Sequence, residues 1–212
     1  MRILVTGGSR GIGKDICDVF TKRGHEVISP SREQLDLSES FSYIPEKIDI
    51  LINNAGINKI DSIYDGEDYE EIMTVNYFSP LRLFKQCLPY MQKQKYGRII
   101  NIGSVWVDYA KPGRSAYSAS KNALHSLTKA ITSEYSSYNI LANTVSPGFI
   151  STDMTFQNNS EESIKELIGQ IPVGRLGHTN EVADLVYFLS VNNSYISGQN
   201  IVIDGGYSCT AK

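Results

Sequence analysis

Six short apolar runs, most of them rich in β-branched residues, recur along the chain. Apolar residues continue through most of these runs without alternating with polar ones, which is typical of parallel strands that are covered on both faces. The predicted strands are Ile3–Thr6, Val27–Ser29, Ile48–Asn53, Arg98–Ile102, Leu141–Ser146 and Ile201–Ile203.

Segments with helical patterns lie between these runs. The predicted helices are Gly13–Arg23, Glu67–Lys93 with a break near Asn76, Ala116–Tyr135, Ser160–Gln170 and Glu181–Leu189. Strands that alternate with helices predict an α/β fold, a Rossmann-type doubly wound parallel sheet. Ligands bind at the carboxyl ends of the strands in such a sheet. Those ends carry Gly7, Asn53, Ser104 and Pro147.

One connection of the predicted sheet is short. A parallel crossover with its helix takes about 10–12 residues or more, and the stretch from Ser29 to Asp36 is too short to hold one. We therefore expect Leu35, Asp36 and Leu37 to form a short edge strand or a loop. The fold would then be shorter than a complete doubly wound sheet, in the part that lies between strands 2 and 4 of such a sheet.

Composition limits the class of protein and its partners. A chain of 212 residues that is 41% hydrophobic fits one globular domain, residues 1–212. A net charge of −3 without a basic block argues against nucleic acid, and no apolar run approaches the roughly 20 residues of a membrane span. Three cysteines without C-x-x-C spacing and no signal-peptide pattern predict a reduced, cytoplasmic protein. The three histidines are scattered, so we expect no metal site.

The stretch LVTGGSRGIGKD, residues 4–15, fits two kinds of phosphate-binding loop. From Gly8 to Lys14 it matches the triphosphatase pattern G-x-x-x-x-G-K. That loop needs Ser or Thr next, because the hydroxyl ligates Mg²⁺, and the residue here is Asp15. From Thr6 to Gly13 it matches T-G-x-x-x-G-x-G, whose glycines let the backbone approach a pyrophosphate. A glycine turn without any ligand is a third interpretation.

A second group of residues carries candidate chemistry. Tyr117 and Lys121 stand four positions apart, on one face of a predicted helix. Ser104 ends a predicted strand at the ligand-binding edge, and Asn76 interrupts an apolar helix. An isolated Y-x-x-x-K is most simply an incidental pair on an exposed helix. It gains meaning here because Asn76, Ser104, Tyr117 and Lys121 occur together and in this order along the chain.

Together the motifs resemble the short-chain dehydrogenase/reductase family, in its single-domain branch. The matching motifs are Thr6-Gly7-x-x-x-Gly11-x-Gly13, Asn53-Asn54-Ala55-Gly56, Asn76, Ser104, Tyr117-x-x-x-Lys121 and Pro147-Gly148. The C-terminal stretch is similar to bacterial 3-oxoacyl-carrier-protein reductases. The resemblance implies an NAD(P)-dependent oxidoreductase that reduces a ketone or oxidises the corresponding alcohol, built as a homodimer or homotetramer. It favours the dinucleotide loop, with Lys14 facing outward.

The resemblance also implies a role for each catalytic candidate. Tyr117 would be the general acid/base, and Lys121 its electrostatic partner and a ligand of the ribose. Ser104 would hydrogen-bond the substrate oxygen, and Asn76 would hold a water or backbone group of a proton relay. These roles are chemically consistent. A phenol with a pKa of about 10 can donate a proton at neutral pH, and a neighbouring ammonium stabilises the ionised phenol that remains.

The choice between NADP and NAD depends on the end of the second strand. NAD-specific members place an acidic residue there to bind the ribose 2′-hydroxyl. No acid occurs from Ile28 to Arg32, whereas Ser31, Arg32 and Arg10 can bind a 2′-phosphate, so we predict NADP. The implied cofactor-binding residues are Gly7, Ser9, Arg10, Gly11, Ile12, Gly13, Ser31, Arg32, Asp36, Leu37, Asn53, Ala55, Gly56, Tyr117, Lys121, Pro147, Gly148 and Thr152.

The substrate is less defined than the cofactor. A polar segment, residues 151–171, is expected to form a lid, and either a 3-oxoacyl thioester or a keto-sugar derivative fits. Trp106 either narrows the substrate pocket or packs as a core or interface aromatic. A non-catalytic dinucleotide-binding regulator is the alternative function. It needs only the glycine loop, so the full set of catalytic candidates argues against it.

Overall fold

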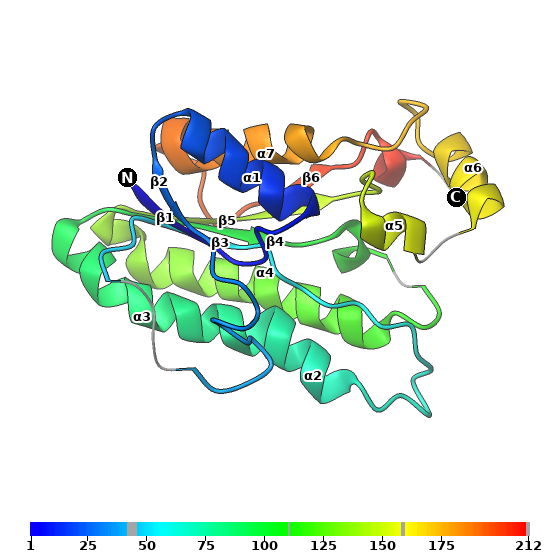
Figure 1. Cartoon of the computed structure of the whole chain (residues 1–212), viewed down its shortest axis with the longest axis horizontal. Coiled ribbons are helices and arrows are strands. Elements are labelled where there is room, and N and C mark those ends of the chain that lie inside the picture. The colour runs from blue at the N-terminus through cyan, green and yellow to red at the C-terminus, as the bar shows by residue number, and fades with distance from the viewer. Residues whose placement is uncertain (42–45, 110, 158–159, 211–212) are drawn as a thin grey trace.

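The computed structural model describes residues 1–41, 46–109, 111–157 and 160–210, and places six parallel strands in one sheet (Figure 1). The order of the strands across the sheet is β2-β1-β3-β4-β5-β6. All six predicted strands are confirmed, and none of their ends is shifted by more than two residues. Their bounds are β1 Arg2–Val5, β2 Glu26–Ile28, β3 Ile50–Asn53, β4 Gly97–Ile102, β5 Ile140–Pro147 and β6 Asn200–Ile203.

Seven α-helices are found among the described residues. They are α1 Gly11–Lys22, α2 Tyr69–Met73, α3 Ser79–Gln94, α4 Ser115–Tyr135, α5 Asp153–Gln157, α6 Glu161–Gly169 and α7 Thr179–Tyr187. Every predicted helix is present, and the expected break near Asn76 is a π-helical turn, Thr74–Phe78, between α2 and α3. A second π-helical turn, Phe188–Asn192, extends α7. Short 3₁₀ turns cover Val105–Val107, Ser136–Tyr138 and Tyr207–Cys209. No described helix has the length and hydropathy required to cross a membrane.

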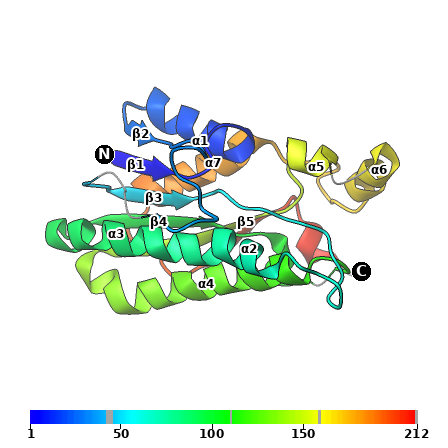
Figure 2. The ribbon, with the colours of Figure 1, turned by 60° about the horizontal axis from the view of Figure 1, so that its bottom comes forward.

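Helices cover both faces of the sheet (Figure 2). Helices α1 and α7 pack on one face through Ile16, Phe20, Val182 and Val186, all of which are fully buried. Helices α3 and α4 cover the other face through Leu83, Met91, Leu124 and Ile131. Because apolar side chains of the strands meet both layers, the strands are apolar throughout and do not alternate.

The connection from β2 to β3 contains no helix or strand in its described parts, residues 29–41 and 46–49. Leu35, Asp36 and Leu37 are therefore a loop, which decides between the two forms expected for them. The loop is held against α3, since the hydroxyl of Ser79 donates to the carbonyl of Leu37 at 2.6 Å. Strand β2 consequently lies at the edge of the sheet.

The chain reverses its direction across the sheet between β1 and β3. Strand β2 pairs with one side of β1, and β3 pairs with the other side. A crevice forms outside the carboxyl ends of two such strands, because the connections leave in opposite directions. This position predicts where a ligand binds.

Candidate functional site

The turn between β1 and α1 depends on glycine. Gly7 has a φ of +68°, a left-handed conformation that side chains disfavour. A Cβ at Gly13 would lie 2.1 Å from the carbonyl oxygen of Gly7. Helix α1 then begins without a side-chain cap from Arg10 and without an acidic residue in its first turn. Its first amide groups therefore offer a positive end to an anion, as in phosphate-binding turns.

Polar contacts join this turn to the end of β3. The side-chain amide of Asn54 donates to the carbonyls of Thr6 and Gly7, each at 3.0 Å. The hydroxyl of Thr6 accepts from the backbone amides of Asn54 and Ala55 at 3.1 and 3.0 Å. These bonds fix the glycine turn against β3. Asn54 belongs to the Asn53-Asn54-Ala55-Gly56 motif that carries the resemblance, but it was not among the implied cofactor-binding residues.

Two adjoining cavities lie at the carboxyl ends of the strands. The larger has a volume of about 570 Å³ and extends beside the loop after β2; its lining includes Gly7, Ser9, Ser31, Arg32, Asp36, Leu37, Ala55 and Gly56. The smaller has a volume of about 340 Å³ and is lined by Gly7, Ser9, Arg10, Gly11, Ile12, Gly13, Ala55, Gly56, Ser104, Tyr117, Lys121, Pro147, Gly148 and Thr152, among others. Four residues are common to both linings, so the cavities form one elongated site.

Asn53 lies apart from both cavities. Its side chain is 3% exposed and donates to the side-chain oxygen of Asn101 on β4 at 2.8 Å. Successive side chains of a strand point to opposite faces, so the last residue of β3 reaches into the layer below the sheet. The backbone immediately after it reaches the cavities.

Asn76 also lies outside the cavity linings, where it secures the backbone beside them. The π-helical turn contains this side chain, which is 1% exposed. Its oxygen accepts from the amide of Ile57, and its nitrogen donates to the carbonyl of Ile57, both at 2.9 Å. A further bond joins it to the hydroxyl of Ser120 at 3.0 Å. Asn76 thus holds a backbone group next to Gly56, which lines both cavities.

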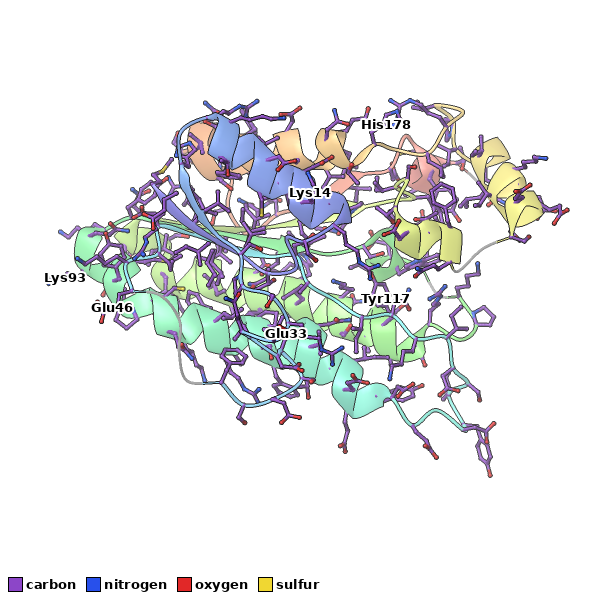
Figure 3. The ribbon with its side chains drawn as sticks, viewed as in Figure 1. Lys14, Glu33, Glu46, Lys93, Tyr117 and His178 are labelled. Carbon is purple, nitrogen blue, oxygen red and sulfur yellow. The ribbon has the colours of Figure 1, made fainter. Side chains whose placement is uncertain are left out.

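Ser104, Tyr117 and Lys121 all line the smaller cavity and not the larger one (Figure 3 shows Tyr117 near the start of α4). Ser104 follows β4 and its hydroxyl accepts from the amide of Trp106 at 3.3 Å. The ammonium of Lys121 lies 5.6 Å from the centre of the Tyr117 ring. It donates to the carbonyl of Ile102 at 2.8 Å. The end of β4 therefore supplies a hydroxyl, and one turn of α4 supplies a phenol and an amine, to one place.

The electrostatic environment sets the protonation of this group. Burial lowers the pKa of Lys121 to about 8. Burial raises the pKa of the Tyr117 phenol, while a hydrogen bond with Ser104 and the positive charge of Arg114 act in the opposite direction. At neutral pH the phenol keeps its proton and Lys121 is largely cationic. The site is thus prepared to donate a proton.

The buried ammonium of Lys121 has a cost in stability. Between pH 8 and the ordinary pKa of 10.5, the unfolded chain binds more protons here than the folded chain, so stability rises with pH across this range. Below pH 8 Lys121 is protonated in both the folded and the unfolded chain, so burial of its charge lowers the free energy of unfolding by the full amount. We expect Lys121→Met to raise the free energy of unfolding at neutral pH by as much as about 3 kcal/mol. The gain should disappear at strongly alkaline pH.

Urea denaturation at several pH values measures this effect. Lys129→Met, at an exposed position of the same helix, is the control and should change little. If Lys121→Met is no more stable than the unmodified protein at neutral pH, then the bond from Lys121 to Ile102 outweighs the cost of burial.

Comparisons with known proteins agree on a family. A family model described as enoyl-(acyl carrier protein) reductase matches residues 36–208. The 3-oxoacyl-[acyl-carrier-protein] reductase FabG of Vibrio cholerae is 36% identical over 233 aligned positions, which cover 96% of this chain and 95% of that protein. The chain belongs to the short-chain dehydrogenase/reductase family.

Solved structures of similar proteins extend this finding. The structure titled "ElxO with NADP Bound" is 28% identical, covers 99% of each chain and has a TM-score of 0.88. A 4-hydroxyisoleucine dehydrogenase mutant complexed with NADH and succinate is 29% identical, covers 100% of each chain and has a TM-score of 0.89. Short-chain dehydrogenases/reductases are NAD(P)-dependent oxidoreductases, and this chain is an enzyme of that class. The non-catalytic alternative is not supported.

Membership in the short-chain dehydrogenase/reductase family favours the dinucleotide pattern over the triphosphatase pattern for the glycine loop. Lys14 is exposed on α1 and forms an ion pair with Asp18 at 2.5 Å. Asp15 accepts from the hydroxyl of Thr179 at 2.5 Å. Neither side chain lines the cavities, so the triphosphatase pattern in this stretch has no counterpart in the site.

Helices α5 and α6 form the segment that we expected to be a lid. They lie beyond the carboxyl ends of the strands (Figure 1). Asp153 of α5 pairs with Arg10 of the glycine turn at 3.5 Å, and Thr152 borders the smaller cavity. Residues 158 and 159 of the expected lid lie outside the described part of the chain. Asp153 and Thr155 also line the smaller cavity, and they were not predicted because α5 is too short for a periodic pattern.

Trp106 joins an aromatic cluster close to the site of this short-chain dehydrogenase/reductase. Its ring meets that of Phe149 edge-on, with the ring centres 6.0 Å apart. Phe149 in turn meets Tyr207, with 4.9 Å between ring centres. Trp106 lines neither cavity, which favours the packing role among the two that we considered.

Proposed function

We propose that this enzyme binds NADP along the two cavities and reduces a ketone, or oxidises the corresponding alcohol, at Tyr117. The observation that carries the proposal is that Ser104, Tyr117 and Lys121 meet at one end of an elongated site whose centre is a glycine turn. The uncapped start of α1 fits a pyrophosphate, because its free amide groups can donate to phosphate oxygens. Gly13 leaves the close approach that such a ligand needs.

The chain's own residues then perform the proton chemistry. Bound NADPH supplies the hydride. Tyr117 donates its proton to the oxygen of the carbonyl group, and Ser104 holds that oxygen by a hydrogen bond. The charge of Lys121 stabilises the ionised phenol that remains, and the same ammonium binds the ribose. Asn76 holds the backbone of Ile57, which we infer supports the relay that returns a proton to Tyr117.

The preference for NADP comes from the rim of the larger cavity. Ser31 and Arg32 are exposed there, and no acidic residue occupies the end of β2. Arg32 pairs with Asp36 at 3.2 Å, and its side chain is 76% exposed, so it is free to turn toward a 2′-phosphate. The related ElxO structure contains NADP, and the related 4-hydroxyisoleucine dehydrogenase contains NADH.

Replacing Arg32 with Glu tests the preference. The loss of a charge-assisted bond should weaken NADPH binding by about 1.5–3 kcal/mol, and the affinity for NADH should not fall. Fluorescence titration with each cofactor measures both affinities. Lys93→Glu makes the same change of charge at the far end of α3 (Figure 3) and is the control. Equal affinity of the unmodified protein for NADPH and NADH would overturn the assignment.

Two substrate classes are consistent with the proposal. The FabG relatives favour a 3-oxoacyl thioester, and a keto-sugar derivative is the second class that the sequence left open. We also infer that residues 1–212 form one domain in which residues 151–171 close over the substrate. A panel of ketones and acyl thioesters, followed by NADPH absorbance, tests the activity itself.

We further propose that the protein is a cytoplasmic homodimer or homotetramer. Strand β6 is the last strand of the sheet formed by the described residues and leaves an edge, where Val202 is 37% exposed. Apolar sheet edges favour association. All three cysteines are free thiols, which fits a reducing compartment.

A further inference from the structure

One carboxylate lines the cavity that we assign to the pyrophosphate and the nicotinamide. Of the described residues around this smaller cavity, Arg10 and Lys121 are cationic and Asp153 is the only acidic one. The carboxylate of Asp153 lies 3.5 Å from the guanidinium of Arg10. Because Arg10 belongs to the glycine turn and Asp153 begins α5, the ion pair joins these two elements. The mechanism proposed above gives Asp153 no task.

The neighbours of Asp153 keep it beside the cavity. The glycine turn and the start of α5 are close, because a Cβ at Gly11 would lie 3.6 Å from the methyl group of Thr152. The hydroxyl of Thr155 donates to the carbonyl of Ile150 at 2.6 Å, which ties the first turn of α5 to the chain before it. Thr152, Thr155 and Ile150 also line the smaller cavity. The carboxylate is therefore part of a built wall.

A negative charge at this place opposes an anionic ligand. Arg10 directly precedes α1, whose free amide groups we assign to the pyrophosphate. Charges interact over a Debye length of about 8 Å at physiological salt, so a carboxylate bonded to Arg10 acts on phosphates held at this turn. Phosphates also compete for the guanidinium, which binds them strongly. The side chains of Arg10 and Asp153 are 70% and 64% exposed, so their pair contributes little stability and can exchange partners.

We propose that Asp153 limits how tightly the enzyme holds its cofactor. In the empty site it occupies Arg10, and in the loaded site its charge repels the phosphates and speeds their release. The proposal rests on the binding of NADP proposed above. An ion pair that only fastens α5 makes the opposite prediction, because its removal would loosen a wall of the cavity and weaken binding. The sign of the change therefore separates the two roles.

Asp153→Asn tests the proposal, since it removes the charge and keeps the shape. We expect NADPH to bind roughly 3- to 10-fold more tightly at low salt, mainly through slower dissociation, as measured by stopped-flow fluorescence. The gain should shrink in 1 M salt, where the Debye length is about 3 Å. Asp153→Glu retains the charge and should give no gain. Asp184→Asn is the matched control, because it breaks an exposed ion pair with Arg23 at 3.1 Å that lines neither cavity.

The same substitution in an Arg10→Gln background tests the exchange of partners. The gain from Asp153→Asn should be smaller there, because no guanidinium remains to be released. Unchanged or weaker NADPH binding in Asp153→Asn would overturn the proposal, and so would an equal gain in Asp184→Asn or a gain that is the same at all salt concentrations. Failure of the unmodified protein to bind NADPH would reject the proposed function as a whole, whereas binding without the gain would reject only the role of Asp153.

Discussion

Replacing Tyr117 with Phe should lower the turnover of any ketone that the protein accepts by about 10²–10⁴-fold, the usual effect of losing a positioned general acid. The substitution keeps the ring, which lies 5.6 Å from the Lys121 ammonium. It removes only the hydroxyl, whose pKa is raised by burial. NADPH affinity should change little, because the glycine turn that we assign to the pyrophosphate is built independently of the phenol.

Steady-state turnover together with NADPH titration measures the two effects separately. Tyr138→Phe, at an exposed position after α4, makes the same chemical change and should leave both unchanged. Near-normal turnover in Tyr117→Phe would reject the catalytic assignment. Loss of cofactor binding along with activity would instead make Tyr117 a structural residue.

Replacing Gly13 with Ala should destabilise the fold and abolish cofactor binding. The added Cβ would lie 2.1 Å from the carbonyl oxygen of Gly7 and 2.4 Å from the side-chain nitrogen of Asn54. Neither group can retreat easily, since the first is backbone and the second makes the bonds that join β1 to β3. Relieving such overlap in a packed region costs about 3 kcal/mol or more.

Chemical denaturation and NADPH titration measure the effect of Gly13→Ala. The matched control is Gly169→Ala at the end of α6, where an added Cβ meets no atom within 4 Å. This control should retain stability and binding. A Gly13→Ala variant with both properties intact would show that the turn adjusts, and that its close packing is not what shapes the phosphate site.

The strands could be predicted because they are continuous apolar runs, and the long helices could be predicted because each is longer than the period of its pattern. Helix α5 has five residues and offers no periodic signal. The break at Asn76 was predicted from its polar side chain, but its π-helical form was not. The loop at Leu35–Leu37 was left between two forms, since apolar side chains at alternate positions serve a strand and an anchored loop equally well. Tertiary contact with Ser79 decides the matter.

The residues of the site that follow the strands could be predicted, because the topology of a doubly wound sheet brings the carboxyl ends of its strands together. Ser104, Pro147 and the glycine turn meet in the cavities as the doubly wound order requires. Asn53 and Asn54 are adjacent in sequence, yet only the second borders the smaller cavity, because pleating turns the first away.

Transfer of deuterium from NADPH, labelled at the nicotinamide carbon that donates hydride, tests the central claim most directly. The protein is incubated with labelled NADPH and each ketone of the panel, and the products are analysed by mass spectrometry and NMR. We predict one deuterium on the carbinol carbon of at least one product, and almost none with Tyr117→Phe. Tight binding of NADPH without transfer to any carbonyl carbon would contradict the assignment of this chain as a ketone reductase.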